Sequence, residues 1–343
     1  MIKTLQKLVE AEHLTREEAR SVIERLMSGE LSPAQIGAFL AAMQIKGVST
    51  DELVGAAEAM RSKMTRIECD LWPIVDCCGT GGDNSGTFNI STAAAFVVAG
   101  AGICVAKHGN RSVSSRSGSA DVLEALEINV SLDPNGIERC LQEAGIAFLF
   151  AQTLHPAMKH VAKARRELGI KTIFNLLGPL TNPAGAQVQL VGVFDSRVQR
   201  MYAEALRELG CQRAMVVCGA DGLDELSNTG PNHVVELENG ELRESTLDPE
   251  VYGLTRAHKS DLRGGKPREN AELIEAVVSG RDHGPRRDVV VLNAGALIML
   301  AGNADSLDAG IEAAAASIDG GQALGKLDAL RWLAPLAMAS PGR

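Results

Sequence analysis

DCCGTGGDNSGTFNIST, from Asp76 to Thr92, and KHGNRSVSSRSGSAD, from Lys107 to Asp121, are the two glycine- and serine-rich stretches that decide the fold. Each follows a short apolar run typical of a strand and leads into a run typical of a helix. Glycines let backbone N–H groups turn toward an anion, and the following helix adds unpaired N–H groups and its positive dipole end. The sequence therefore predicts two phosphate-binding loops on neighbouring strands, and a ligand with two separate phosphate groups.

Side chains in both loops supply further donors to an anion. Asn89, Ser91 and Thr92 stand where the first of the two helices would begin, and the second loop adds four cationic donors: Lys107, His108, Arg111 and Arg116. The whole chain carries a formal net charge of −9. Because glycines and serines separate the cations in an otherwise acidic protein, an anion site explains them better than a solvated surface patch.

Composition limits the class of protein. The 343 residues are long enough for a large α/β domain with an appended unit, and with 45% hydrophobic but only 3% aromatic residues the core must be aliphatic. The acidic balance argues against a nucleic-acid partner. The seven cysteines show no paired CxxC spacing, so we expect reduced thiols and a cytoplasmic location. We expect no signal peptide and no membrane span, since the longest apolar run, Val289 to Ala301, is interrupted by Asn293.

The first 70 residues have a helical period throughout. Capping boxes pair Thr15 with Glu18, Ser32 with Gln35 and Ser49 with Glu52, and predict three helix starts. An apolar stripe follows the second of these starts: Ile36, Phe39, Leu40 and Met43. This stripe either forms the core of a small helical unit or meets another subunit.

After Trp72-Pro73, short strands alternate with helices, which favours a largely parallel sheet covered by helices. The predicted strands are Ile74 to Cys77, Ile103 to Ala106, Ala147 to Phe150, Gln187 to Val193 and Arg213 to Val217. The predicted helices are Ala93 to Ala99, Ala120 to Leu126, Pro134 to Glu143, Arg197 to Leu209, Asn270 to Val278 and a stretch from Asp288 onward. Asn239-Gly240 between two further strands predicts a β-hairpin. We thus expect an α/β protein: a small all-helical domain over residues 1–70, and an α/β domain with a mostly parallel central sheet over residues 71–343.

Two further features are ambiguous when taken alone. In DGLDE, Asp224 and Glu225 are adjacent carboxylates after a glycine turn; such acids near a phosphate site bind Mg²⁺, but an exposed acidic turn is the commoner explanation. Arg165 lies among other cations in a helical run and by itself indicates a solvated helix charge.

The motifs GTGGD and KHGNR, about one strand–helix unit apart, resemble those of anthranilate phosphoribosyltransferases. The resemblance continues in order through HPAMKH (His155 to His160), FNLLGPLTNP (Phe174 to Pro183) and DGLDE (Asp221 to Glu225). It implies transfer of 5-phosphoribose from 5-phosphoribosyl 1-diphosphate (PRPP) to the amine of anthranilate, with release of diphosphate, in tryptophan biosynthesis. Members of the family commonly pair through their N-terminal helices, so the resemblance also implies a homodimer, with the apolar stripe as its interface.

The resemblance assigns roles residue by residue. Asp224 and Glu225 match the family's Mg²⁺-binding pair, and Ser91 matches its third metal contact. Arg165 matches the arginine that holds the acceptor's carboxylate, beside Asn110. His108 suits a positioning role better than that of a general base, because an aromatic amine attacks without prior deprotonation. The substrate contacts that it implies are Gly79, Gly82, Asp83, Thr87, Asn89, Ile90, Ser91, Thr92, Lys107, His108, Gly109, Asn110, Arg111, Ser112, Val113, Ser114, Ser115, Ser119 and Arg165. Which loop holds the 5-phosphate and which the diphosphate stays open.

The chain departs from the family pattern at Gln152 and Leu154, at Lys163 and at Asn84. The departures at Gln152 and Leu154 and at Lys163 concern the presumed acceptor channel. Three other functions compete with the family assignment. A pyrimidine nucleoside phosphorylase resembles this fold but carries a different second loop. A catalytically silent relative that binds nucleic acid should be basic and lack the acceptor arginine. A dinucleotide-binding oxidoreductase should have GxGxxG, which the glycines from Gly79 to Gly86 do not form.

Overall fold

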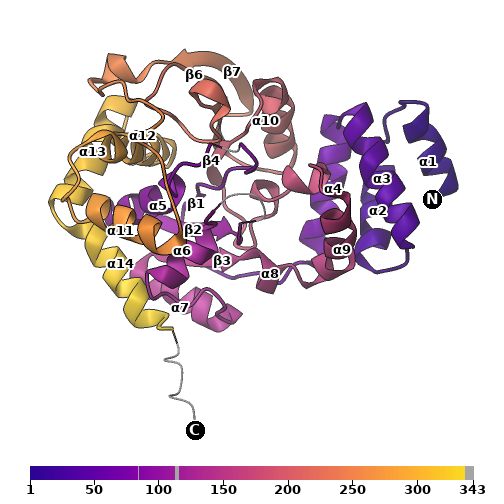
Figure 1. Ribbon diagram of the computed structural model, residues 1–343, viewed down its shortest axis with the longest axis horizontal. Coiled ribbons are helices and arrows are strands. Elements are labelled where there is room, and N and C mark those ends of the chain that lie inside the picture. The colour runs from indigo at the N-terminus through magenta and orange to yellow at the C-terminus, as the bar shows by residue number, and fades with distance from the viewer. Residues whose placement is uncertain (84, 113–115, 337–343) are drawn as a thin grey trace, which may run out of the picture.

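The computed structural model describes residues 1–83, 85–112 and 116–336. The chain begins with a helical unit that lies to one side of the molecule (Figure 1) and consists of α1 (Ile2–Val9), α2 (Arg16–Met27), α3 (Pro33–Lys46) and α4 (Thr50–Lys63). The predicted capping boxes begin α2, α3 and α4. At α2, the Glu18 N–H donates to Thr15 Oγ1 at 3.2 Å, which satisfies one of the N–H groups that a first helical turn leaves unpaired.

The apolar stripe of α3 lies inside this chain. Its members are at most 4% exposed: Ile36, Phe39, Leu40 and Met43. They share a core with Tyr202 and with α9 (Lys159–Leu168), a helix from later in the sequence that packs against α2 and α3 (Figure 1). The expectation that this stripe meets a second subunit is therefore wrong, because the chain itself covers it. The division of the chain at residue 70 stays a prediction.

The described residues form a seven-stranded sheet in the order β3-β2-β1-β4-β5-β6-β7. Its first five strands are parallel, and β6 and β7 are antiparallel. The predicted hairpin is confirmed: Asn239 and Gly240 join β6 to β7 with φ of 52° and 79°. The strands are β1 (Ile74–Asp76), β2 (Cys104–Gly109), β3 (Ile146–Phe150), β4 (Val188–Gly192), β5 (Arg213–Cys218), β6 (Asn232–Glu238) and β7 (Glu241–Leu247). The predicted α/β class with a mostly parallel sheet is confirmed.

Helices cover both faces of this sheet. Leu190 of β4 faces a core with α5 and α12, whereas the next residue, Val191, faces the core shared with α10 and the helical unit. The helices outside the helical unit are α5 (Ile90–Gly100), α6 (Ser119–Ala125), α7 (Pro134–Ala144), α8 (Ala151–Leu154), α9, α10 (Gln199–Glu208), α11 (Pro267–Val278), α12 (Pro285–Leu300), α13 (Leu307–Asp319) and α14 (Gln322–Leu333). Across the described residues, every helix is too short or too polar to traverse a membrane.

Two boundaries differ from the prediction in a way that matters for the site. Strand β2 continues to Gly109, so Lys107 and His108 are strand residues and not loop residues. Helix α5 begins at Ile90, so Ser91 and Thr92 lie in its first turn. Both differences arise because β3 pairs with β2 as far as Gly109 and because the helix packs on the sheet, contacts that a local pattern does not contain.

The strand order also indicates where a ligand binds. From β1 the chain adds β2 and β3 on one side, then crosses to add β4 and β5 on the other. In parallel sheets, ligands bind outside the carboxyl ends of the strands where the order reverses. The glycine loop that follows β1 lies at this reversal.

Candidate active site

A cavity of about 340 Å³ lies at this point, next to the carboxyl ends of β1 and β2. It brings together most of the described residues that were predicted to contact substrate, including both loops, Arg165 and the Asp224–Glu225 pair. Ile90 does not line it: its side chain is in the core and its N–H donates to Phe88 O at 2.8 Å. Val113, Ser114 and Ser115, and the departure at Asn84, lie outside the described residues.

The first glycine loop folds around Asp224. The Gly81 N–H donates to Asp224 Oδ2 at 2.6 Å, and the Thr80 N–H donates to Gly192 O at the end of β4 at 2.8 Å. A Cβ on Gly79 would lie 2.5 Å from Asp224 Oδ2, so a side chain at this position would push the carboxylate away. Gly81 and Gly82 have φ of 70° and 78°, which disfavour any residue with a side chain. The glycines therefore serve close approach to an acid as well as the turn.

Asp224 and Glu225 both line the cavity, which does not support an isolated exposed acidic turn. Glu225 Oε1 accepts from the Ser91 N–H at 3.2 Å. Burial raises the pKa of Glu225 to about 7, and burial together with the charges of Asp83 and Glu225 raises the pKa of Asp224 well above its usual range. Half-buried carboxylates whose ionisation is disfavoured fit a bound cation. Within the described residues, no group of three or more His, Cys, Asp or Glu side chains could hold a metal ion, so a Mg²⁺ ion at this pair would need further oxygen ligands, such as those of a hydroxyl, a phosphate or water.

Lys107 brings a buried cation to the same place. Its Nζ donates to Cys77 O at 3.0 Å and to Ser91 Oγ at 3.2 Å, and its side chain is 5% exposed. The β2 strand therefore carries an ammonium group directly to the hydroxyl that the family resemblance assigns to the metal.

His108 is not a cation. Its ring is buried, its Nδ1 lies 2.9 Å from Gly178 O, and its Nε2 lies 3.3 Å from Nε2 of the buried His155. A carbonyl oxygen accepts only, so Nδ1 carries the proton and Nε2 is left to accept from His155. Burial lowers the pKa of His108 to about 3 and that of His155 to about 4. The expectation of a cationic donor at His108 is therefore wrong, because β2 carries this ring into the interior.

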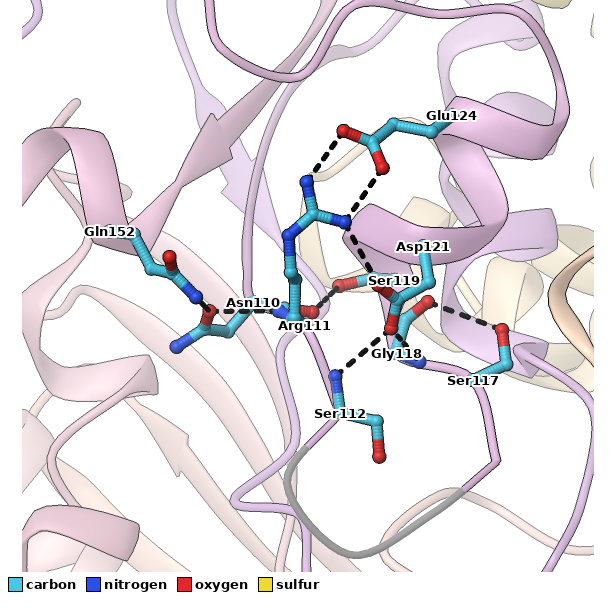
Figure 2. A network of polar contacts seen from close by, with 9 residues as sticks. All are labelled: Asn110, Arg111, Ser112, Ser117, Gly118, Ser119, Asp121, Glu124 and Gln152. Atoms are coloured by element: carbon cyan, nitrogen blue, oxygen red, sulfur yellow. Dashed lines mark hydrogen bonds and ion pairs between the residues drawn. The ribbon is translucent and has the colours of Figure 1, made fainter. Parts of the chain in front are cut away.

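Figure 2 shows a carboxylate clamp at the base of the second loop. Asp121 Oδ2 accepts from the Ser112 N–H at 3.1 Å and from the Gly118 N–H at 2.8 Å, which ties together the two ends of the loop. Arg111 donates to Asp121 Oδ1 at 3.0 Å and forms two 2.6 Å bonds with Glu124. The guanidinium of Arg111 is thus already paired, and it supports the loop. Asp121 and Glu124 were not among the predicted site residues, although an acid at the third position of α6 is a recognisable capping signal.

Arg165 and Asn110, the two predicted acceptor contacts, both line the cavity. The Arg165 guanidinium lies 5.4 Å from the ring centroid of Phe174, and burial lowers its pKa. Within the described part of the chain, Arg165 has no carboxylate partner. Because it is partly buried in the cavity lining, the alternative of a solvated helix charge does not fit. Asn110 Oδ1 accepts from Gln152 Nε2 at 3.2 Å (Figure 2), so this departure from the family pattern contacts a predicted acceptor residue.

Leu154 and Lys163, two other departures, do not line the cavity. Leu154 is fully buried in the core, and the 83% exposed side chain of Lys163 forms an ion pair with Glu167 at 3.8 Å. A residue that sequence reasoning missed is Asn270, which is 2% exposed and donates to Asn89 Oδ1 at 2.9 Å. Its partner is 181 positions away in the sequence, and no local signal marks such a pair.

Comparisons with known proteins agree over nearly the whole length. Residues 2–64 match the glycosyl transferase family, helical bundle domain, and residues 71–324 match the glycosyl transferase family, a/b domain. The chain is 54% identical over 328 residues to the anthranilate phosphoribosyltransferase of Pelotomaculum thermopropionicum, covering 95% of each chain. The crystal structure of the Thermus thermophilus anthranilate phosphoribosyltransferase superimposes with a TM-score of 0.91 at 44% identity, covering 96% of this chain and 98% of that one. The Saccharomyces cerevisiae enzyme in complex with PRPP and Mg superimposes with a TM-score of 0.89 at 28% identity, covering 97% of each.

Proposed function

This chain belongs to the glycosyl transferase family as an anthranilate phosphoribosyltransferase, and from that premise we propose how its residues hold the two substrates. Its activity is the transfer of 5-phosphoribose from PRPP to anthranilate in tryptophan biosynthesis. The observation that supports the residue roles is the single cavity in which both glycine loops, the acidic pair and Arg165 meet.

Asp224, Glu225 and the Ser91 hydroxyl are the proposed Mg²⁺ ligands. The yeast relative is described in complex with PRPP and Mg, and the raised pKa values of the two carboxylates in this chain fit a cation in the same place. When bound, Mg²⁺ supplies positive charge that offsets the carboxylates and the diphosphate. Lys107 adds a second cation 3.2 Å from Ser91 Oγ. These residues would stabilise negative charge on the leaving diphosphate, so electrostatics and positioning carry the reaction.

Arg165 and Asn110 are the proposed acceptor contacts. A guanidinium matches a carboxylate with two parallel hydrogen bonds, and the planar Phe174 ring beneath it restricts its orientation. His108 is proposed as a positioning residue, because its Nδ1–H is directed at Gly178 O and its low pKa keeps it neutral.

A fluorescence assay of anthranilate consumption tests the function. Consumption should require both PRPP and Mg²⁺, and thymidine with phosphate should give no phosphorolysis. Asp224→Ala/Glu225→Ala should raise the Mg²⁺ requirement while circular dichroism stays unchanged. Full activity of this double variant at low Mg²⁺ would remove the metal assignment, and thymidine cleavage without anthranilate consumption would support the nucleoside phosphorylase instead.

A homodimer through the N-terminal helices is also proposed, with a different interface from the one that the stripe predicted. Exposed apolar side chains on α1 and α3 support it: Ile2, Val9 and Ile45 are 74%, 80% and 87% exposed. Helix α1 packs against α3, so the two helices that carry these side chains are neighbours. An isologous contact between two copies would bury them.

A cytoplasmic location is proposed as well. All seven cysteines lie within the described residues and are free thiols, as a reducing compartment would keep them. Cell fractionation provides the test: recovery of the protein from the cell envelope would contradict this location.

A further inference from the structure

A second cavity, of about 490 Å³, opens beside the substrate cavity. The two share Ser85, Gly86, Thr87 and Ser117 in their linings, so they are neighbours across the two glycine loops. We call this second cavity the vestibule. None of the roles assigned above uses its outer wall, which consists of residues between Lys259 and Asn270.

The wall of the vestibule is built onto the active-site loop. Phe88 N–H donates to Leu262 O at 3.0 Å, and Gly264 N–H donates to Gly86 O at 2.9 Å, as in a short antiparallel pair. A Cβ on Gly264 would lie 2.7 Å from the Phe88 backbone, so the approach of the two segments requires glycine. The segments therefore hold each other at a fixed separation.

A buried amide joins the same wall to the substrate site. Asn270 Oδ1 accepts from the Gly265 N–H at 2.7 Å, and Asn270 Nδ2 donates to Asn89 Oδ1 at 2.9 Å. Asn89 Nδ2 in turn donates to Ser117 O at 3.3 Å. The vestibule wall, the start of α5 and the second loop thus form one connected structure, and the vestibule is a preformed cavity.

Two arginines line the vestibule, Arg116 and Arg263, and the described residues of its lining include no carboxylate. Within residues 1–83, 85–112 and 116–336, no side chain forms an ion pair with Arg116 or Arg263, although nearby arginines are paired: Arg256 with Glu250 at 2.7 Å, and Arg268 with Glu272 at 3.9 Å. Two exposed guanidinium groups without acidic partners, in a chain with a net charge of −9, favour an external anion.

We propose that the vestibule is a binding site for the diphosphate anion as it leaves the substrate cavity. Guanidinium groups bind phosphate oxygens through paired hydrogen bonds, and a diphosphate offers oxygens to Arg116 and Arg263 together. The inference rests on the proposed function, because the reaction supplies the diphosphate. A cationic site next to the point of bond cleavage draws the product away from Mg²⁺ and Lys107, and release of product often limits turnover in enzymes.

The test uses the full chain and the variant Arg116→Gln/Arg263→Gln, with inorganic diphosphate as the probe in calorimetry. The wild type should bind a second diphosphate in addition to the one in the substrate cavity. The variant should lose this second site or bind it roughly 10- to 100-fold more weakly, as expected when charge-assisted hydrogen bonds are removed. Inhibition by diphosphate in the anthranilate assay should weaken in parallel, with the KM for anthranilate unchanged.

Arg268→Gln is the matched control, since this 91% exposed arginine lies on α11 outside the vestibule lining. Equal weakening in Arg268→Gln would show that net charge alone attracts the anion and would overturn the proposal. So would unchanged diphosphate binding in the double variant. If the double variant no longer binds ribose 5-phosphate but still binds diphosphate, the two arginines contact the 5-phosphate end of the donor. That result would overturn the assignment of the vestibule to the leaving group. A wild type without transferase activity would instead remove the proposed function, because the calorimetry does not depend on turnover.

Discussion

At the residue scale, the pair His108 and His155 couples stability to pH. The folded-state pKa of His155 is about 4, below the ordinary value near 6.5, because burial disfavours the charged ring. Above about pH 6.5 the histidine ring is neutral in both the folded and the unfolded chain, so burial of the ring contributes fully to stability. As the pH falls, the unfolded chain binds a proton that the folded chain does not, so stability is lost between about pH 6.5 and pH 4.

We therefore expect each histidine to lower the free energy of unfolding by up to about 1.4 kcal/mol per pH unit in this window, a change that the raised carboxyl pKa values of Asp224 and Glu225 oppose. Urea denaturation at pH 7 and pH 5 measures it. His155→Gln should unfold more easily than the wild type at pH 7, and the difference between the two should shrink at pH 5. The same difference at both pH values would show that His155 does not contribute to the pH dependence.

Asp121 is the second residue with a testable role, because one carboxylate ties both ends of the second loop. Asp121→Asn replaces one acceptor oxygen with an NH₂ group that cannot accept from Ser112 or Gly118. We expect the KM for PRPP to rise about 10-fold, the value of one lost charge-assisted hydrogen bond. Steady-state kinetics with varied PRPP measure it.

Asp319→Asn is the control for Asp121→Asn, since it breaks an ion pair between Asp319 of α13 and Arg287 of α12, outside the substrate cavity. It should leave the KM for PRPP unchanged. If Asp121→Asn also leaves it unchanged, the clamp does not organise the donor site.

Arg165→Ala tests the acceptor contact. Loss of its charge-assisted contact should weaken transition-state binding by about 2–4 kcal/mol, mainly through a higher KM for anthranilate. The neighbouring Arg166→Ala is the control, because Arg166 is exposed and does not line the cavity. A collapse of PRPP affinity with normal anthranilate affinity would show that the assigned role is wrong.

At the element scale, the end of β4 and the turn that carries the acidic pair are in direct contact. A Cβ on Gly192 would lie 1.6 Å from the backbone oxygen of Asp224, so neither backbone can accommodate a methyl group without moving. Gly192→Ala should therefore shift the carboxylates, lower the free energy of unfolding by about 1–3 kcal/mol and reduce turnover.

Gly37→Ala is the comparison for Gly192→Ala. Gly37 lies within α3 and has nothing within 4 Å of its would-be Cβ, so alanine should stabilise the helix by about 0.5–1 kcal/mol and leave turnover unchanged. Thermal unfolding and turnover of both variants provide the measurement. Normal turnover in Gly192→Ala would mean that the turn adjusts without moving the acids.

At the scale of the whole molecule, the proposed dimer depends on the outer surface of α1 and α3. Val9→Glu/Ile45→Glu places two charges on it and should give monomers in sedimentation at micromolar concentration, where the wild type should be dimeric. Val251→Glu, at a 77% exposed position outside the helical unit, should leave the dimer intact. A monomeric wild type, or a double variant that stays dimeric, would contradict the proposed interface.

Local sequence patterns were enough to predict the features that depend on neighbouring residues. Capping boxes, the Asn239-Gly240 turn and the alternation of strands with helices were predicted from local patterns, because propensity and hydrogen bonding within a few residues control them. Short motifs also pointed to the glycine loops and the acidic pair as site candidates, because their resemblance to a known family extends along the chain, and these residues line one cavity.

Long-range contacts determine which of these groups are charged, paired or covered. Helix α9 covers the α3 stripe, Glu124 pairs with Arg111, and burial keeps His108 neutral. Asn270 meets Asn89 across 181 positions of sequence. Each of these contacts joins segments far apart in the chain. Solvation and charge depend on which segments meet in space, and a local pattern carries no information about that meeting.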